Sequence, residues 1–194
     1  MRGLGGAALW QSGSAAAALG LALAATAQAQ QVDPARSELV FVTRQMGVPV
    51  EGRIERWEAQ LAFDPRKPES ASLLLRMDIG SVRFAAPEVT AEAQRGVWFD
   101  GARFPQASFQ STSIKALGAG RYEMAGRLSL KGRTHELVVP IDLVQAGPAG
   151  TASGSFTVDR SAFRVGEAEW SDASLVAHEV RVRFKIALSG LAAP

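Results

Sequence analysis

Cysteine and asparagine are absent from this sequence of 194 residues, and long apolar runs are scarce. Without cysteine the chain can form neither disulfide bonds nor thiolate metal sites, so its stability must come from packing. Without asparagine, its hairpin turns must rely on Gly, Asp and Pro. The composition therefore excludes a disulfide-stapled scaffold and a cysteine-based metal domain.

The one marked apolar stretch lies at the N-terminus and is too short for a membrane anchor. Residues 1–29 carry a single charge, Arg2, and the apolar residues are densest at 15–25. A membrane-spanning helix would need about twenty continuous apolar residues. Small residues at Ala27 and Ala29 fit a signal-peptidase site. We therefore predict that 1–29 is a secretory signal, cleaved after Ala29 or alternatively after Ala27, and that the protein is periplasmic.

A positive excess of charge is also lacking. Removal of 29 residues leaves 165, with 20 Lys and Arg against 19 Asp and Glu. Nucleic-acid-binding proteins carry clustered basic residues and a clear positive excess, so we expect no nucleic-acid partner. A length of 165 residues fits one domain with a sizeable core, and no internal repeat divides it. We predict a single domain over 30–194.

Alternation of apolar and polar residues dominates the sequence from Glu38 onward. In the last segment, Val180, Val182 and Phe184 alternate with charged residues, which is typical of a strand with one buried face. The same pattern predicts strands at 38–44, 54–63, 73–79, 106–115, 122–130, 137–143, 151–159 and 180–188. About eight strands with hairpin-like spacing predict an all-β, mainly antiparallel sheet that is closed or folded on itself.

One short helix is expected at 87–95, with Pro87 at its start and Gly96 after its end. About nine residues are too few for a stable isolated helix, so packing must hold it. An aromatic-rich segment, 97–114, follows directly. We expect this segment to close one side of the barrel.

Residues suited to catalysis or metal binding do not gather in the sequence. His135 and His178 are 43 positions apart, and neither belongs to a metal-binding or serine-hydrolase motif. We expect both to be exposed hairpin residues, with no metal and no cofactor, although a site assembled through space stays open. The acidic residues of the 165–174 loop are expected to be solvated. Arg181, Arg183 and Lys185 are expected to form the wet face of an outer strand, with a membrane partner as the alternative.

Large apolar residues on the predicted strands could either fill the barrel or line a cavity for one ligand. Flexible methionine side chains suit an adaptable lipid site. The candidate lining residues are Phe41, Phe63, Met77, Phe99, Phe109, Met124, Phe163 and Phe184, with Trp98 and Trp170 near the rim.

Four separated blocks carry a resemblance to a known family. They read RSELVFVTRQMGVPVEGRIERWEAQLAFDP, WFDGARFPQASFQSTSI, YEMAGRLSLKGRTHELVVPIDL and FTVDRSAFRVGEAEWSDASLVAHEVRVRFKIAL. In this order and spacing they resemble the YceI-like family of exported lipid-binding proteins. The resemblance implies an extended, lipocalin-like antiparallel barrel, so the fold expected for this chain is an all-β, eight-stranded lipocalin-like barrel with one short helical segment. It also implies a long amphiphile in the interior, typically a polyisoprenoid such as a quinone tail.

The resemblance has two departures. Arg36-Ser37 stands where many members have His-Ser, and Gln94-Arg95 replaces a common Arg-Asp pair. If those positions hold a headgroup in the family, headgroup preference differs here.

The sequence thus predicts a noncatalytic periplasmic carrier of a polyisoprenoid or similar amphiphile. The alternatives are an enzyme acting on a lipid or stress metabolite, and an interaction module for a membrane protein of the cytochrome b561 type. The last follows from the similarity of the C-terminal block to family members associated with such cytochromes. A homodimer is also open.

Overall fold

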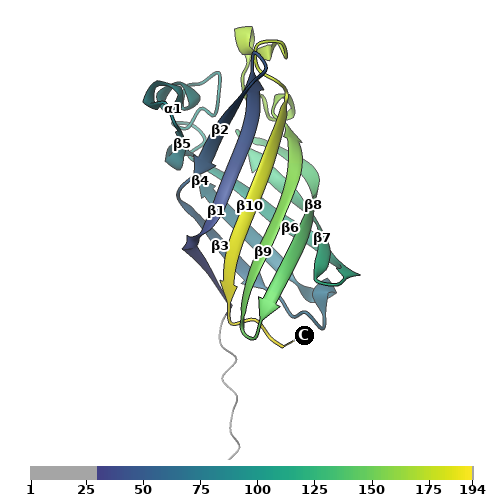
Figure 1. The fold of residues 1–194 in the computed structure, drawn as a ribbon. Coiled ribbons are helices and arrows are strands. Elements are labelled where there is room, and N and C mark those ends of the chain that lie inside the picture. The colour runs from purple at the N-terminus through teal and green to yellow at the C-terminus, as the bar shows by residue number, and fades with distance from the viewer. Residues whose placement is uncertain (1–29, 194) are drawn as a thin grey trace, which may run out of the picture.

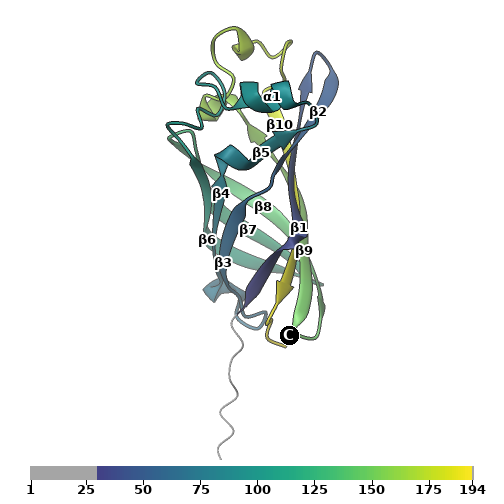
Figure 2. The ribbon, with the colours of Figure 1, turned by 90° about the vertical axis from the view of Figure 1, so that its left-hand side faces the viewer.

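Ten strands form one antiparallel sheet that curls into an elongated barrel (Figures 1 and 2). The computed structural model describes residues 30–193. The strands are β1 (Gln31–Gln45), β2 (Val48–Ile54), β3 (Trp57–Ala62), β4 (Ser72–Asp78), β5 (Val82–Phe84), β6 (Gln106–Gly118), β7 (Arg121–Leu130), β8 (Arg133–Ala146), β9 (Ala149–Asp159) and β10 (Glu179–Ser189). Their order in the sheet is β3-β4-β6-β7-β8-β9-β10-β1-β2-β5. The predicted signal sequence lies outside the described residues.

The all-β, lipocalin-like architecture is confirmed, but the strand number is ten instead of eight. The expected strand 54–63 divides at Glu55-Arg56, where β2 ends and β3 begins. Two strands were missed. β2 contains Gly52 at an inward position, which interrupts its apolar alternation, and β5 has only three residues. Arg181, Arg183 and Lys185 do lie on an exposed face, yet β10 is an inner strand of the sheet between β9 and β1.

The two edge strands of the sheet are β3, which pairs with β4, and β5, which pairs with β2, and further bonds extend this pairing. The Asp78 amide donates to the Arg56 carbonyl (3.0 Å) and the Glu55 amide to the Ser81 carbonyl (3.3 Å). Near the lower end, the Gln30 side-chain amide donates to the Phe63 carbonyl and accepts from the Phe63 amide (2.7 Å). A side chain thus takes the place of a strand neighbour at Phe63.

A helix and an ordered loop lie at the upper end of the barrel (Figure 2). The helix α1 (Pro87–Ala93) is two residues shorter than expected, and its buried residue is Ala93. The loop, called here the capping loop, comprises residues 160–178 and contains the 3-10 turns η3 (Ser161–Phe163) and η4 (Ala168–Ser171). Two further 3-10 turns, η1 (Pro68–Ser70) and η2 (Ile79–Ser81), flank β4. Within residues 30–193, no helix is long and apolar enough to cross a membrane.

Candidate functional site

The barrel encloses a cavity of about 530 Å³ whose wall is almost entirely apolar. All ten strands contribute side chains to its wall, and the short strand β5 contributes Val82 and Phe84. A volume in the range of 300–1,000 Å³ with a mainly apolar lining is typical of a small-molecule pocket. The interior is therefore hollow enough to hold a ligand instead of being filled by side chains.

Nine of the ten residues proposed from the sequence line this cavity. They are Phe41, Phe63, Met77, Trp98, Phe99, Phe109, Met124, Trp170 and Phe184. Phe163 is a correction, because it is absent from the lining. It belongs to the capping loop itself, is 1% exposed and packs with Val158 and Val165, and its ring centroid lies 4.8 Å from that of His135.

Three of the lining phenylalanines lie over glycines of neighbouring strands. Phe41 is paired with Gly52 across β1 and β2, and Phe184 with Gly154 across β10 and β9. The Phe109 ring covers Gly126 of β7. A Cβ atom at any of these glycines would overlap the ring. The glycines therefore let the rings lie against the sheet, which keeps the centre of the barrel open.

The remaining aromatic contacts mark the two ends of the cavity. At the lower end Phe63 and Tyr122 meet edge to face, with ring centroids 5.4 Å apart. At the upper end Trp98 and Trp170 lie with centroids 5.5 Å apart, as expected for a rim. Phe41 contacts Phe99 edge to face at 6.3 Å. The aromatic segment after α1 thus joins the cavity wall at its upper end.

Arg160 organises the capping loop from inside. Its side chain is 4% exposed. All five N–H donors of a guanidinium are used here: Nε donates to the Ala177 carbonyl, Nη1 to those of Val165 and Gly166, and Nη2 to those of Trp170 and Val176, at 2.6–3.0 Å. Burial lowers the pKa of Arg160 from its ordinary value. Its charge is stabilised by carbonyl dipoles, and its Cζ atom lies over the Trp98 ring, 5.8 Å from the ring centroid.

A second buried cation ties the capping loop to the β7–β8 turn. Lys131 Nζ donates to the Arg164 carbonyl at 2.6 Å and to Glu167 Oε2 at 3.1 Å. Arg164 Nε contacts Glu167 Oε1 at 2.6 Å. The hydrogen bonds from Lys131 and Arg164 hold the pKa of Glu167 below its ordinary value. Glu167 is therefore part of a structural ion network, which corrects the expectation of simple solvation.

The capping loop is also bonded to the barrel wall. Gln45 pairs with Val176 in an isolated bridge, and the Met46 amide donates to the Leu175 carbonyl at 2.8 Å. The Gly166 and Glu167 amides both donate to the Val97 carbonyl. Trp98 Nε1 is buried next to this junction and has no hydrogen-bond partner among the described residues. Such an unsatisfied donor destabilises the folded state by about 1–3 kcal/mol, so it weakens the attachment of the capping loop to the barrel.

The histidines do not assemble a catalytic or metal site in the described part of the chain. His135 Nε2 contacts the Ala162 carbonyl at 3.0 Å, and His178 Nε2 the Ser171 carbonyl at 2.8 Å. His135 is exposed as expected, whereas His178 is half-buried. Neither lines the cavity. Across residues 30–193, no group of three or more His, Asp or Glu side chains is arranged to hold a metal ion.

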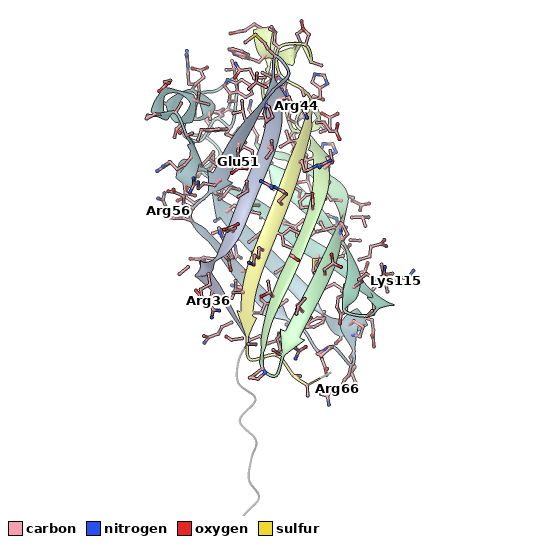
Figure 3. All side chains as sticks on the ribbon, viewed as in Figure 1. Arg36, Arg44, Glu51, Arg56, Arg66 and Lys115 are labelled. Carbon is pink, nitrogen blue, oxygen red and sulfur yellow. The ribbon has the colours of Figure 1, made fainter. Side chains whose placement is uncertain are left out.

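The positions at which this sequence departs from the family pattern lie away from the cavity. Arg36 is exposed on the outer face of the barrel (Figure 3). Ser37 fills a four-residue bulge in β1, where its Oγ accepts from the Ala187 amide at 2.9 Å. Gln94 Nε2 donates to the Ile79 carbonyl, and Arg95 pairs with Glu92. Ser37, Gln94 and Arg95 thus have structural contacts, and none of the four residues lines the cavity.

The fold and the cavity together define a β-barrel binding protein with an apolar interior. The chain belongs to the YceI-like family: the model of the YceI-like domain matches residues 30–188. UPF0312 proteins are among its relatives. One from Vibrio cholerae is 24% identical over 135 residues, 68% of this chain and 71% of that protein. One from Pseudomonas syringae is 27% identical over 132 residues, 64% and 69% of the two chains.

Solved structures share the same fold. BcnA of Burkholderia cenocepacia is 36% identical, with a TM-score of 0.78 over 81% of this chain and 99% of that chain. A domain of Saccharophagus degradans described as polyisoprenoid-binding superimposes with a TM-score of 0.66 at 15% identity, over 83% and 98% of the chains. The YceI protein of Campylobacter jejuni gives 0.65 at 16% identity, over 70% and 82%. The family resemblance predicted from the sequence is confirmed.

Proposed function

We propose that the protein is a periplasmic carrier that holds a polyisoprenoid or a similar long amphiphile inside the barrel without chemically changing it. The observation that carries this proposal is the continuous apolar cavity, which extends from Phe63 at the lower end to Trp170 at the upper end. A fold neighbour described as polyisoprenoid-binding supports the ligand class. The predicted signal sequence supports the location.

Burial of a prenyl tail supplies ample binding free energy. Each buried CH₂ contributes about 0.8 kcal/mol. Drug-sized ligands reach about 0.3 kcal/mol per heavy atom, so a tail of roughly 40 atoms could reach about 12 kcal/mol, near nanomolar affinity. Side chains such as Met77 and Met124 can adjust to a branched tail because thioethers are flexible.

The first experiment is purification of the protein from its native host, followed by extraction and mass spectrometry of bound lipid. We expect a prenyl lipid in near-stoichiometric amount. Repeated recovery of folded protein without any amphiphile would refute the proposal.

A matched pair of variants makes the test specific to the cavity. Ala152 lines the cavity on β9, whereas Ala125 on β7 lies outside its lining. Ala152→Phe should reduce co-purifying lipid at least several-fold because the ring occupies the ligand's space. Ala125→Phe adds the same side chain outside the cavity and should leave the lipid content unchanged.

A further inference from the structure

Exposed apolar side chains gather at the end of the β1–β2 hairpin, where the hairpin meets the capping loop. Met46 is 70% exposed, Val48 63% and Leu175 37%. The two segments are joined by the hydrogen bond from the Met46 amide to the Leu175 carbonyl (2.8 Å), and both lie at the upper end of the barrel (Figure 2). These three residues are called here the apolar tip. Exposed apolar residues that gather in this way mark interaction sites, whereas single ones need no explanation.

The chemistry of the hairpin turn does not explain Met46. Met46 (φ 47°) and Gly47 (φ 82°) are both left-handed, as in the two-residue hairpin turns that favour Asn-Gly or Asp-Gly. In two other hairpins of this chain, Ala119-Gly120 and Lys131-Gly132 occupy the turn between the strands. The turn therefore does not require a large apolar side chain that projects into water.

The apolar tip continues the wall of the cavity beyond its upper end. Side chains alternate along a strand, so Val48 is on the same face of β2 as Val50, which lines the cavity. Val48 is also paired with Gln45, the last lining residue of β1. On the capping loop, Leu175 directly precedes Val176, another lining residue. An apolar strip thus runs from the cavity wall to the exposed end of the hairpin.

The size and charge of the tip favour a lipid bilayer over a protein partner. A stable protein interface buries about 800 Å² of each partner, which is more than three side chains can supply. A bilayer needs no complementary surface, because protruding apolar side chains enter its acyl region. The neighbouring charges have both signs. Arg44, near the upper end of β1 in Figure 3, donates from Nη1 to the Gly47 carbonyl, and Asp172 Oδ1 accepts from the Ser174 amide. Contact with a bilayer would therefore rest on apolar burial and not on charge.

Resting on the proposed function, we propose that the apolar tip inserts into the surface of a lipid bilayer and brings the upper end of the cavity against it. A long amphiphile that passes through water exposes its apolar tail, which is unfavourable. Insertion of Met46, Val48 and Leu175 places an apolar strip between the acyl region and the cavity wall. Three side chains are few, so the contact is weak and reversible, as a carrier that leaves the membrane requires.

Membrane binding is tested by sedimentation of the protein with sucrose-loaded phosphatidylcholine vesicles over a range of lipid concentrations, at low and at high ionic strength. The partition coefficient should be similar in both salts, because apolar insertion is not screened by ions. Met46→Gln with Val48→Thr should lower it at least about five-fold. Full binding by this double variant, or no binding by the unmodified protein, would overturn the inference and leave the carrier function intact.

Val138→Thr with Val144→Thr is the matched control. It makes the same kind of change at side chains of β8 that are 56% and 73% exposed, and its partition coefficient should equal that of the unmodified protein. An equal fall in both double variants would assign membrane binding to overall surface apolarity and overturn the role of the tip.

Two other results would assign the contact elsewhere and overturn the inference. Binding that requires anionic vesicles and disappears at high salt would point to Arg181, Arg183 and Lys185 on the exposed face of β10. Self-association of the protein that Met46→Gln with Val48→Thr abolishes, without vesicle binding, would assign the tip to a second copy of the chain.

Transfer of a fluorescent prenyl alcohol from vesicles to delipidated protein tests the consequence for loading. The rate should rise with vesicle concentration, and Met46→Gln with Val48→Thr should slow it at least about five-fold. Neither residue lines the cavity, so the Kd of the probe should stay within about two-fold. Equal transfer rates would overturn the role of the tip. No uptake of the probe by the unmodified protein would instead refute the proposed carrier function.

Discussion

The single side chain of Arg160 stabilises the capping loop at the upper end of the cavity. Its five hydrogen bonds hold carbonyls from residues 165–177 of the capping loop. Lysine offers three donors, so Arg160→Lys leaves at least two of these carbonyls without a partner. We expect the free energy of unfolding to fall by about 3 kcal/mol. Denaturant unfolding measures this, and amide exchange should locate the loss in the capping loop.

Arg164→Lys is the control for that variant. The Arg164 side chain is 58% exposed, and its ion pair with Glu167 is partly solvated. Surface pairs of this kind contribute about 0–1 kcal/mol. If Arg160→Lys cost no more than this control, the capping loop would not depend on the buried guanidinium.

Glu167 makes the capping loop sensitive to acid. Lys131 and Arg164 lower the pKa of its carboxyl in the folded state. A carboxyl with a lowered folded pKa stabilises the protein fully above its unfolded pKa, about 4.3, and this contribution is lost as the pH falls through the folded value. We expect the free energy of unfolding to drop below about pH 4, and Glu167→Gln to show a shallower drop. Urea unfolding between pH 3 and 7 measures both slopes. Equal slopes would exclude Glu167 as a source of the acid sensitivity.

At the level of the strands, Gly52 controls how much room the cavity has. The three atoms nearest to a Cβ atom at this position all belong to the Phe41 ring, a side chain that can turn inward. Gly52→Ala should therefore push the ring into the cavity. Binding of a prenyl alcohol should weaken at least several-fold, and the free energy of unfolding should change less than the free energy of binding. Isothermal titration on delipidated protein measures the affinity.

Gly96→Ala is the matched control, because a Cβ atom there meets nothing within 4 Å. Its affinity should equal that of the unmodified protein. A Gly52→Ala variant that binds equally well would show that the Phe41 ring has space to retreat without entering the cavity.

Gly52 also shows why one strand of the fold could not be predicted from the sequence. Period-two alternation was sufficient for the long strands, because one face of each is buried and the other is wet. It failed for β2, where Gly52 replaces an apolar residue because a ring from β1 covers it. Glycine directly opposite phenylalanine is a signal that could have found this strand, but it requires the register of the two strands. β5, with three residues, is too short for any periodic signal.

The residues of the cavity wall could be predicted from strand alternation, whereas the structure of the capping loop could not. Large apolar residues at inward positions of strands must reach the interior, so nine of ten lie on the wall. Phe163 is the exception because it lies on η3, where strand alternation gives no direction. Arg160 was missed entirely. Its role depends on five backbone carbonyls that the fold brings together, and a lone arginine in a sequence gives no sign of them.

For the whole molecule, a carrier function predicts that ligand and stability are linked. A ligand that binds only the folded barrel stabilises it by about 2.7 kcal/mol at a hundred-fold excess over Kd. For a domain of this size, that corresponds to a rise in Tm of roughly 5–10 °C. Calorimetry of delipidated protein with and without a prenyl alcohol measures the shift. An unchanged Tm at saturating lipid would contradict binding inside the barrel.

The side-chain bonds of Gln30 at the edge of β3 have a consequence for how copies of the protein behave toward one another. An exposed strand edge offers free amide and carbonyl groups, which can pair with another chain and start aggregation. The Gln30 amide occupies both backbone groups of Phe63, directly after β3. If the signal is cleaved after Ala29, Gln30 becomes the first residue of the exported chain. Cleavage one or two residues later would then remove this protection and leave that end of the sheet edge open to self-association.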